Sequence, residues 1–370
     1  MTWMPLTVAA VIAIVIAAPA GFVALRRRAV ARRLALPPSG IDEQGYVRIG
    51  GVDQWVQIRG ADRANPVLLM LHAHGASMIP LTPLYTSWER HFTVVQWDRR
   101  TVGRTRRAGR GSGDADWTFD RFVADGVELV EHLRQRLGQD RVVLAGHSQG
   151  TVVGIGMARR RPDLFHAYVG MSQMVDMPRN ESIVYERLLA QARSAGRRRA
   201  AGGLAALGPP PYPDRTDWIR RLRYTMSLDP EGRAWQRTAL TRTLFMPGYS
   251  VRDVLGWFTD VTVFPQHLYA ETMAVTPETL GTRFAVPVVL LHGTRDVFAL
   301  PELAEEYAER IEAPGKAFVP LDGLGHMAPF LAPDRVIAAL LENVHRARHH
   351  QGDGDQGDAG LEHHGELRPA

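Results

Sequence analysis

The sequence of 370 residues contains no cysteine and one lysine, Lys316. Without cysteine, the chain can form no disulfide, no thiolate zinc site and no cysteine nucleophile. Arginine carries the rest of the basic charge, and the formal net charge is only +5. Five arginines lie in one short run between residues 26 and 33. Because the rest of the chain is close to neutral, we expect no nucleic-acid partner.

Charge is also absent from Trp3 to Leu25, a run that includes VAAVIAIVIAA. As a helix, these 23 residues would span roughly 35 Å, enough to cross the hydrocarbon core of a bilayer. No basic residue precedes the run and arginines follow it. This pattern favours an uncleaved single-pass membrane anchor within residues 1–38, with the catalytic domain in the cytoplasm. The alternative is a signal peptide cleaved near residues 18–20, which would make the protein secreted.

Strand and helix patterns alternate through the middle of the chain. Short apolar runs such as PVLLMLHAHG, FTVVQWD and RVVLAG are typical of buried strands, and TFDRFVADGVELVEHLRQRLG is typical of an amphipathic helix. The alternation predicts a mostly parallel central sheet with helices on both faces. It breaks at residues 176–281, where helical, arginine-rich sequence predicts an inserted cap domain. The core is then expected in two parts, 39–175 and 282–348, followed by a disordered polar tail at 349–370.

One serine lies in a setting that favours a nucleophile. Ser148 is the centre of GHSQG, a G-x-S-x-G pattern between the strand candidate RVVLAG and the helix candidate TVVGIGMA. Such a sharp strand-to-helix turn lifts the serine hydroxyl out of the sheet. An activated serine needs a base and an acid that orients the base, in the chain order serine, acid, histidine. Asp296 in LLHGTRDVF and His326 in LDGLGHMAPF fit this order, with Asp176 as an alternative acid.

A tetrahedral intermediate also needs two backbone N–H donors, which form an oxyanion hole. One is expected at Gln149, directly after the serine, and the other at His74, in the loop HAHGAS. The imidazoles of His72 and His74 are expected to hold this loop in place. A metal cluster of His72, His74 and His147 is an alternative that the chemistry does not require. We therefore expect neither a metal nor a cofactor.

Together these motifs resemble the α/β-hydrolase superfamily and, within it, the proline-iminopeptidase-like serine hydrolases. The resemblance extends from about Gly45 to Val344 and rests on LHAHGAS, VVQWDRRTVGRT, VVLAGHSQG, LGPPPYPD, VPVVLLHGTRDVF and APGKAFVPLDGLGHMAPF. It implies an α/β-hydrolase fold with a helical cap over a triad of Ser148, Asp296 and His326. Three places depart from the family pattern: HAHGA replaces H-G-G-P-G, DRRT replaces D-Q-R-G, and Gln149 replaces tryptophan. Aminopeptidase specificity therefore does not follow from the fold.

The expected function is hydrolysis of an ester or amide bond through an acyl-enzyme, on a small-molecule ester or a short peptide. An aminopeptidase would need carboxylates for the substrate ammonium, and the cap candidates are Glu186, Asp260 and Glu271. Trp257 is a candidate for an apolar substrate pocket. One alternative is a catalytically silent protein of the same fold that binds a small ligand. Another is an arginine-rich scaffold for membranes or nucleic acids, which the nearly neutral charge outside the N-terminal run disfavours.

Overall fold

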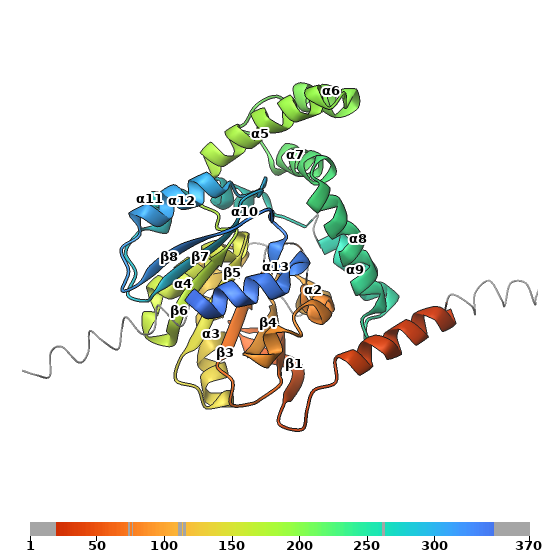
Figure 1. Cartoon of the computed structure of the whole chain (residues 1–370), viewed down its shortest axis with the longest axis vertical. Helices are drawn as coiled ribbons and strands as arrows, with labels where there is room; N and C mark the ends of the chain where they lie inside the picture. Colours follow the sequence, from red (N-terminus) through yellow and green to blue (C-terminus); the bar gives the residue numbers. More distant parts are fainter. Residues whose placement is uncertain are drawn as a thin grey trace, which may run out of the picture.

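The computed structural model describes residues 20–343, apart from residues 73, 74, 76, 110–112, 114, 115, 261 and 262. At its centre lies an eight-stranded sheet in the order β1-β2-β4-β3-β5-β6-β7-β8 (Figure 1). In this order, the strands β4, β3, β5, β6, β7 and β8 pair in parallel with their neighbours. The strands β1 and β2 form an antiparallel edge next to β4. The predicted mostly parallel sheet is confirmed. The strands are β1 Ile41–Ile49, β2 Val52–Gly60, β3 Val67–Leu71, β4 Thr93–Asp98, β5 Val142–His147, β6 Phe165–Met171, β7 Val288–Gly293 and β8 Lys316–Leu321.

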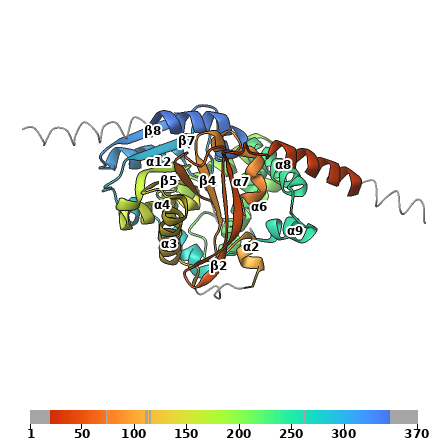
Figure 2. The ribbon, with the colours of Figure 1, turned by 90° about the horizontal axis from the view of Figure 1, so that it is seen from below.

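Helices cover both faces of this sheet because its central strands are apolar on both sides. In β3, Leu69 and Leu71 join the apolar core beneath α3 and α4, whereas Leu68 and Met70 join the core on the opposite face. Successive side chains of a strand point to opposite faces, so a continuous apolar run fits a strand buried on both sides. Figure 2 shows α3 and α4 on one side and the C-terminal helix over residues 333–343 on the other. The helices around the sheet are α2 Gly103–Arg107, α3 Phe119–Leu137, α4 Gln149–Arg160, α12 Pro301–Arg310 and α13 Ala328–Leu331.

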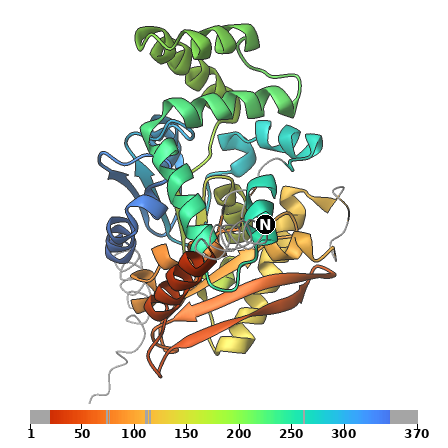
Figure 3. The same ribbon diagram turned by 90° about the vertical axis from the view of Figure 1, so that its right-hand side faces the viewer.

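Between β6 and β7 the chain leaves the sheet and forms a group of helices that we call the cap. The two strands pair directly, with Tyr168 opposite Val288, so the whole cap enters and leaves at one place in the sheet. In Figures 1 and 3, α5, α6 and α7 extend beyond one end of the sheet, and α8 runs back beside it. The boundaries predicted for the cap, 176–281, stay a prediction. Its helices are α5 Met177–Ser194, α6 Arg198–Leu207, α7 Arg215–Leu228, α8 Pro230–Phe245, α9 Val251–Asp260, α10 Gln266–Met273 and α11 Pro277–Leu280.

The prediction of an N-terminal transmembrane helix is wrong. Across the part of the chain that the structure describes, every helix is too short or too polar to cross a bilayer. The helix over residues 20–33 carries the arginine run and lies against the cap, where Arg27 donates hydrogen bonds of 3.1 and 3.2 Å to the Leu244 carbonyl (Figure 3). This finding removes the support for a single-pass anchor. It also removes the support for a membrane partner and for the localisation, which were both inferred from that anchor. Residues 1–19 of the predicted span and the tail at 349–370 lie outside the described residues.

Candidate active site

Ser148 lies at the sharp turn between β5 and α4, as the sequence predicted. Its backbone has φ 53° and ψ −126°, a strained conformation for a residue other than glycine. Two neighbouring glycines permit the turn. A Cβ on Gly146 would lie 2.7 Å from the Gly150 carbonyl oxygen, and a Cβ on Gly150 would lie 2.2 Å from the Leu71 carbonyl oxygen. The turn therefore presents the serine hydroxyl at the carboxyl end of the sheet, beside the start of α4.

Ser148, His326 and Asp296 form one hydrogen-bonded chain. Nε2 of His326 lies 3.0 Å from Oγ of Ser148, and Nδ1 lies 2.8 Å from Oδ2 and 3.0 Å from Oδ1 of Asp296. An ionised carboxylate only accepts hydrogen bonds, so Nδ1 carries the ring proton and Nε2 is free to accept from the serine. The three residues follow β5, β7 and β8. Parallel strands end at the same edge of a sheet, which brings together side chains that are far apart in the sequence.

The environment of Asp296 keeps its carboxylate ionised. Oδ1 accepts hydrogen bonds from the backbone N–H groups of Phe298 at 2.8 Å and Ala299 at 2.9 Å, and Oδ2 lies 3.5 Å from Nε2 of His292. Burial on its own would raise the pKa of Asp296. The electrostatic attraction of the His326 ring, together with hydrogen bonds from His292 and His326, outweighs burial and holds the pKa below its ordinary value.

A second buried histidine supports the backbone of His326 from the core. Nε2 of His147 lies 2.9 Å from the carbonyl oxygen of His326. Burial, and then electrostatic repulsion from the neighbouring His326 ring, lowers the pKa of His147 to about 3, so its ring is neutral and donates this hydrogen bond. Among the described residues, no group of three histidine, aspartate or glutamate side chains could hold a metal ion. His74, which the metal alternative needs, lies outside the described residues.

The predicted oxyanion donors are described only in part. Gln149 is the first residue of α4, so its N–H has no partner within the helix, and its side chain donates to Oγ1 of Thr272 at 3.3 Å. His74 belongs to the loop after β3 and lies outside the described residues. The start of that loop is held by Arg99, whose Nη2 donates to the carbonyl of His72 at 2.9 Å. Burial lowers the pKa of His72 to about 3, so this imidazole is neutral.

Two of the cap carboxylates predicted for a substrate ammonium have protein partners instead. Asp260 is fully buried, and it accepts hydrogen bonds from Arg106 at 2.6 and 2.9 Å and from Arg107 at 3.3 Å. These contacts tie α9 to α2. Glu271 accepts a hydrogen bond of 2.8 Å from the N–H of Phe119, the first residue of α3. The two carboxylates therefore have roles in holding helices together.

The remaining predicted residues also have defined places. Trp257 is buried, and its Nε1 donates to the carbonyl of Ser77 at 2.7 Å. Glu186 is exposed on α5. Asp176, the alternative acid, caps α5 by accepting a hydrogen bond of 3.1 Å from the N–H of Arg179. The acid beside the histidine is Asp296.

One carboxylate at the site was missed by sequence reasoning. Glu231, near the start of α8 in the cap, accepts hydrogen bonds of 2.7 Å from the N–H groups of Gly325 and Met327. Burial raises the pKa of Glu231, although the two hydrogen bonds act in the opposite direction. Its segment, DPEGR, has only the features of an ordinary helix start, and its partners lie more than ninety positions away. The sequence therefore carried no local signal for this contact.

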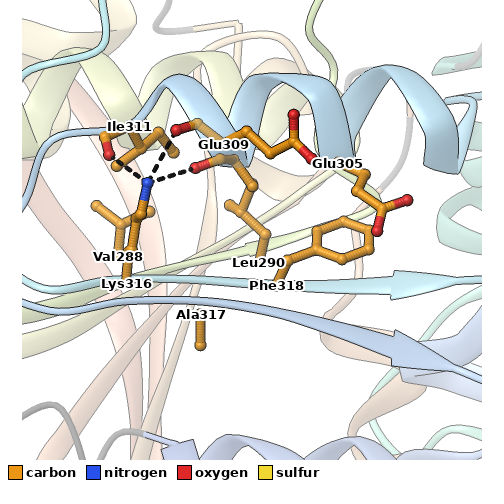
Figure 4. Close-up of a pocket in the computed structure, with 9 residues that line it drawn as sticks. Val288, Leu290, Glu305, Glu309, Ile311, Lys316, Ala317 and Phe318 are labelled. Atoms are coloured by element: carbon orange, nitrogen blue, oxygen red, sulfur yellow. Dashed lines mark hydrogen bonds between the residues drawn. The ribbon is translucent and has the colours of Figure 1, made fainter.

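A pocket of about 390 Å³ lies away from the triad, at the starts of β7 and β8 (Figure 4). In Figure 4, Lys316 reaches up to the end of α12. Its Nζ donates to the carbonyls of Ala308 at 3.3 Å, Glu309 at 2.9 Å and Ile311 at 2.8 Å, which caps the helix. Because the triad is at the carboxyl ends of the strands, this pocket is not part of it.

The fold and this arrangement of side chains define an α/β hydrolase, and the chain belongs to the alpha/beta hydrolase family, which residues 68–339 match. It is similar to a probable aminopeptidase, YbaC, of Bacillus subtilis, with 28% identity over 314 residues, covering 82% of this chain and 95% of the relative. A proline iminopeptidase of Saccharolobus solfataricus is 29% identical over 138 residues, covering 37% of this chain and 42% of the relative. The resemblance to proline-iminopeptidase-like proteins is confirmed.

Solved structures give the same fold. A proline iminopeptidase-related protein from Thermus thermophilus superposes with a TM-score of 0.58 at 23% identity, covering 84% of this chain and 99% of that chain. A thermophilic esterase from Thermogutta terrifontis gives a TM-score of 0.53 at 18% identity, covering 83% and 99%. At these identities the likeness shows the architecture alone.

Proposed function

We propose that this α/β hydrolase cleaves an ester or amide bond through an acyl-enzyme formed on Ser148. The observation that carries the proposal is the hydrogen-bonded chain from the Ser148 hydroxyl through His326 to Asp296, with steps of 3.0 and 2.8 Å. Nucleophile, base and orienting acid are in contact in the order that serine hydrolysis needs. We assign one oxyanion donor to the N–H of Gln149 and the other to His74.

In this mechanism Oγ of Ser148 attacks the substrate carbonyl carbon while its proton passes to Nε2 of His326. The N–H of Gln149 stabilises the negative oxygen that forms. His326 then gives the proton to the leaving alcohol or amine, and the acyl group stays on the serine. A water molecule next gives a proton to Nε2 and attacks the acyl carbon, and the serine recovers its proton as the acid leaves. Asp296 stays ionised throughout and stabilises the protonated ring.

The proposed substrates are small esters and short peptides with a free amino terminus. Support for the peptides comes from the likeness to a probable aminopeptidase over 95% of its length. Support for esters comes from the cap, where Asp260 and Glu271 are already engaged by Arg106, Arg107 and Phe119. Neither carboxylate is therefore assigned to a substrate ammonium. The chemistry itself needs no cofactor, because serine, histidine and aspartate supply the nucleophile and the proton transfers.

The proposal is tested with the full chain and a fluorophosphonate probe, read by intact mass. We expect labelling of the wild type and of Ser182→Ala, which changes an exposed serine of the cap, and no labelling of Ser148→Ala or His326→Ala. Hydrolysis of short-chain esters, compared with prolyl and other aminoacyl amides, then assigns the substrate class. A folded wild type that is not labelled would contradict the mechanism and favour a silent ligand-binding protein.

A further inference from the structure

We propose that Glu231 is a positioning residue of the cap that holds the loop of His326, so that the base is correctly placed only when α8 is seated. The inference rests on the proposed function, because it gives His326 the role of base. Glu231 is not assigned contact with the substrate. It acts through the backbone on either side of the histidine.

The carboxylate of Glu231 binds the backbone of the residues directly before and after His326. Its Oε2 accepts from the N–H of Gly325 and its Oε1 from the N–H of Met327, each at 2.7 Å. The approach is close, since a Cβ on Gly325 would lie 2.6 Å from Oε2 and would displace the carboxylate. Both oxygens are therefore used on the N–H groups of the two residues that flank His326.

The same loop is held from the opposite side by the core. The carbonyl oxygen of His326 accepts from Nε2 of His147 at 2.9 Å and lies 3.4 Å from Oγ of Ser172. The backbone of the histidine is thus fixed between a carboxylate of the cap and two side chains of the core. If the cap contact is lost, the two core contacts and the hydrogen bonding of Nδ1 to Asp296 are left to hold the ring beside Ser148.

Helix α8 is itself anchored beside this loop. Asp229 caps its first turn by accepting a hydrogen bond of 2.7 Å from the N–H of Gly232. Trp235, one turn further along, packs against Phe330 with ring centroids 4.6 Å apart and the ring planes tilted by 35°, and Phe330 follows the His326 loop in the chain. Both rings are buried. The position of α8 therefore holds the Glu231 carboxylate at the loop, which links the packing of the cap to the geometry of the base.

Removal of Glu231 should change the rate of the chemical step and leave probe binding alone. A misplacement of about 1 Å can cost about 100-fold in rate, and Gly325 and Met327 would each lose their acceptor. Glutamine keeps one acceptor oxygen and places an N–H₂ group against the other donor. We expect the maximal rate of fluorophosphonate labelling to fall about 100-fold in Glu231→Ala and about tenfold in Glu231→Gln, with the half-saturating probe concentration within about twofold of the wild type.

The experiment measures that rate against probe concentration for the wild type and both variants of the full chain. Glu128→Ala is the matched control, because Glu128 also accepts a backbone hydrogen bond, of 2.9 Å from Gly50, in the turn between β1 and β2 rather than at the His326 loop. Hydrogen exchange of the peptide that spans residues 325–327 gives a second readout. We expect faster exchange there in Glu231→Ala and unchanged labelling in Glu128→Ala.

Each outcome decides the matter. If the wild type is labelled and Glu231→Ala reacts at the same maximal rate, the positioning role is refuted, even if its melting temperature falls. If Glu231→Ala does not fold, Glu231→Gln decides, and a wild-type rate in that variant refutes the inference. If the folded wild type is not labelled at all, the proposed function fails first. The two failures are therefore distinguishable.

Discussion

Replacing Asp296 by asparagine removes one charge, keeps the shape of the side chain and reverses one hydrogen bond. The N–H groups of Phe298 and Ala299 both donate to Oδ1, at 2.8 and 2.9 Å. The amide oxygen of the asparagine must take this place, because its N–H₂ group would face two donors there. The amide nitrogen then replaces Oδ2, which at 2.8 Å is nearer to Nδ1 of His326 than Oδ1 at 3.0 Å, and donates to it. The ring proton moves to Nε2, the atom that must accept the proton of Ser148.

A histidine held in this tautomer cannot act as the base. The expected loss in rate is about 10⁴-fold, which corresponds to about 5.4 kcal/mol of activation free energy. The variant is also less stable at neutral pH. The pKa of Asp296 is lower in the folded chain than in the unfolded chain, so its ionised form favours folding above pH about 4. The difference in unfolding free energy from the wild type should shrink as the pH falls below that value.

The assay is the maximal rate of fluorophosphonate labelling at pH 7 to 8, with thermal unfolding as the check that Asp296→Asn is folded. Asp163→Asn is the matched control, because Asp163 is an exposed carboxylate paired with Arg161, and it should react like the wild type. A folded Asp296→Asn that is labelled within tenfold of the wild-type rate would refute the assignment of the tautomer.

Three other changes test the packing around the site. Gly150→Ala places a methyl group 2.2 Å from the Leu71 carbonyl oxygen. We therefore expect the free energy of unfolding to fall by more than about 4 kcal/mol. A melting temperature equal to that of the wild type would contradict this clash. Burial raises the pKa of Asp98 to about 6, so the folded chain binds this proton more tightly than the unfolded chain. The free energy of unfolding should therefore fall by about 3 kcal/mol as the pH rises from about 4 to about 6. Chemical denaturation at four pH values should show a smaller fall in Asp98→Asn than in the wild type. An equal fall in the two proteins would contradict the raised pKa of Asp98. Arg221→Met leaves the buried Glu181 without its ion-pair partner, at a cost of about 3 to 5 kcal/mol, which chemical denaturation measures and which a second change, Glu181→Gln, should partly restore.

The proximity of Ser148, Asp296 and His326 could be predicted because each residue has a local signature. Ser148 lies in a short motif between a strand and a helix, and Asp296 and His326 each follow an apolar strand. Parallel strands end at one edge of a sheet, so chain order and strand position were sufficient to place them together. The fold class followed from the same alternation of strand and helix.

The roles of the cap residues could not be predicted in this way. Asp260 looked available to a substrate because Arg106 and Arg107, its partners, are about 150 positions away. Glu231 looked like an ordinary first-turn glutamate because its partners belong to a loop after the next two strands. Contacts between the cap and the core depend on how α8 and α9 lie on the sheet, and a hydrophobic pattern along the chain does not contain that information.

The N-terminal prediction failed for a related reason. The uncharged run that ends at Leu25 is long enough for a bilayer, but the sequence does not show what the arginines after it contact. In the structure Arg27 is bound to the Leu244 carbonyl, so part of the expected anchor is a helix that lies on the cap. Length and hydropathy alone could not show that the cap offers this helix a partner.

The insertion of the cap between β6 and β7 also determines when the site can exist. During synthesis Ser148 leaves the ribosome with β5, whereas Asp296 and His326 follow only after the whole cap has been made. The emerging chain therefore carries Ser148 without its proposed base, and Asp296 and His326 arrive with the last strands at the edge of the sheet. A newly made molecule completes the cap before the three residues of the proposed site can come together.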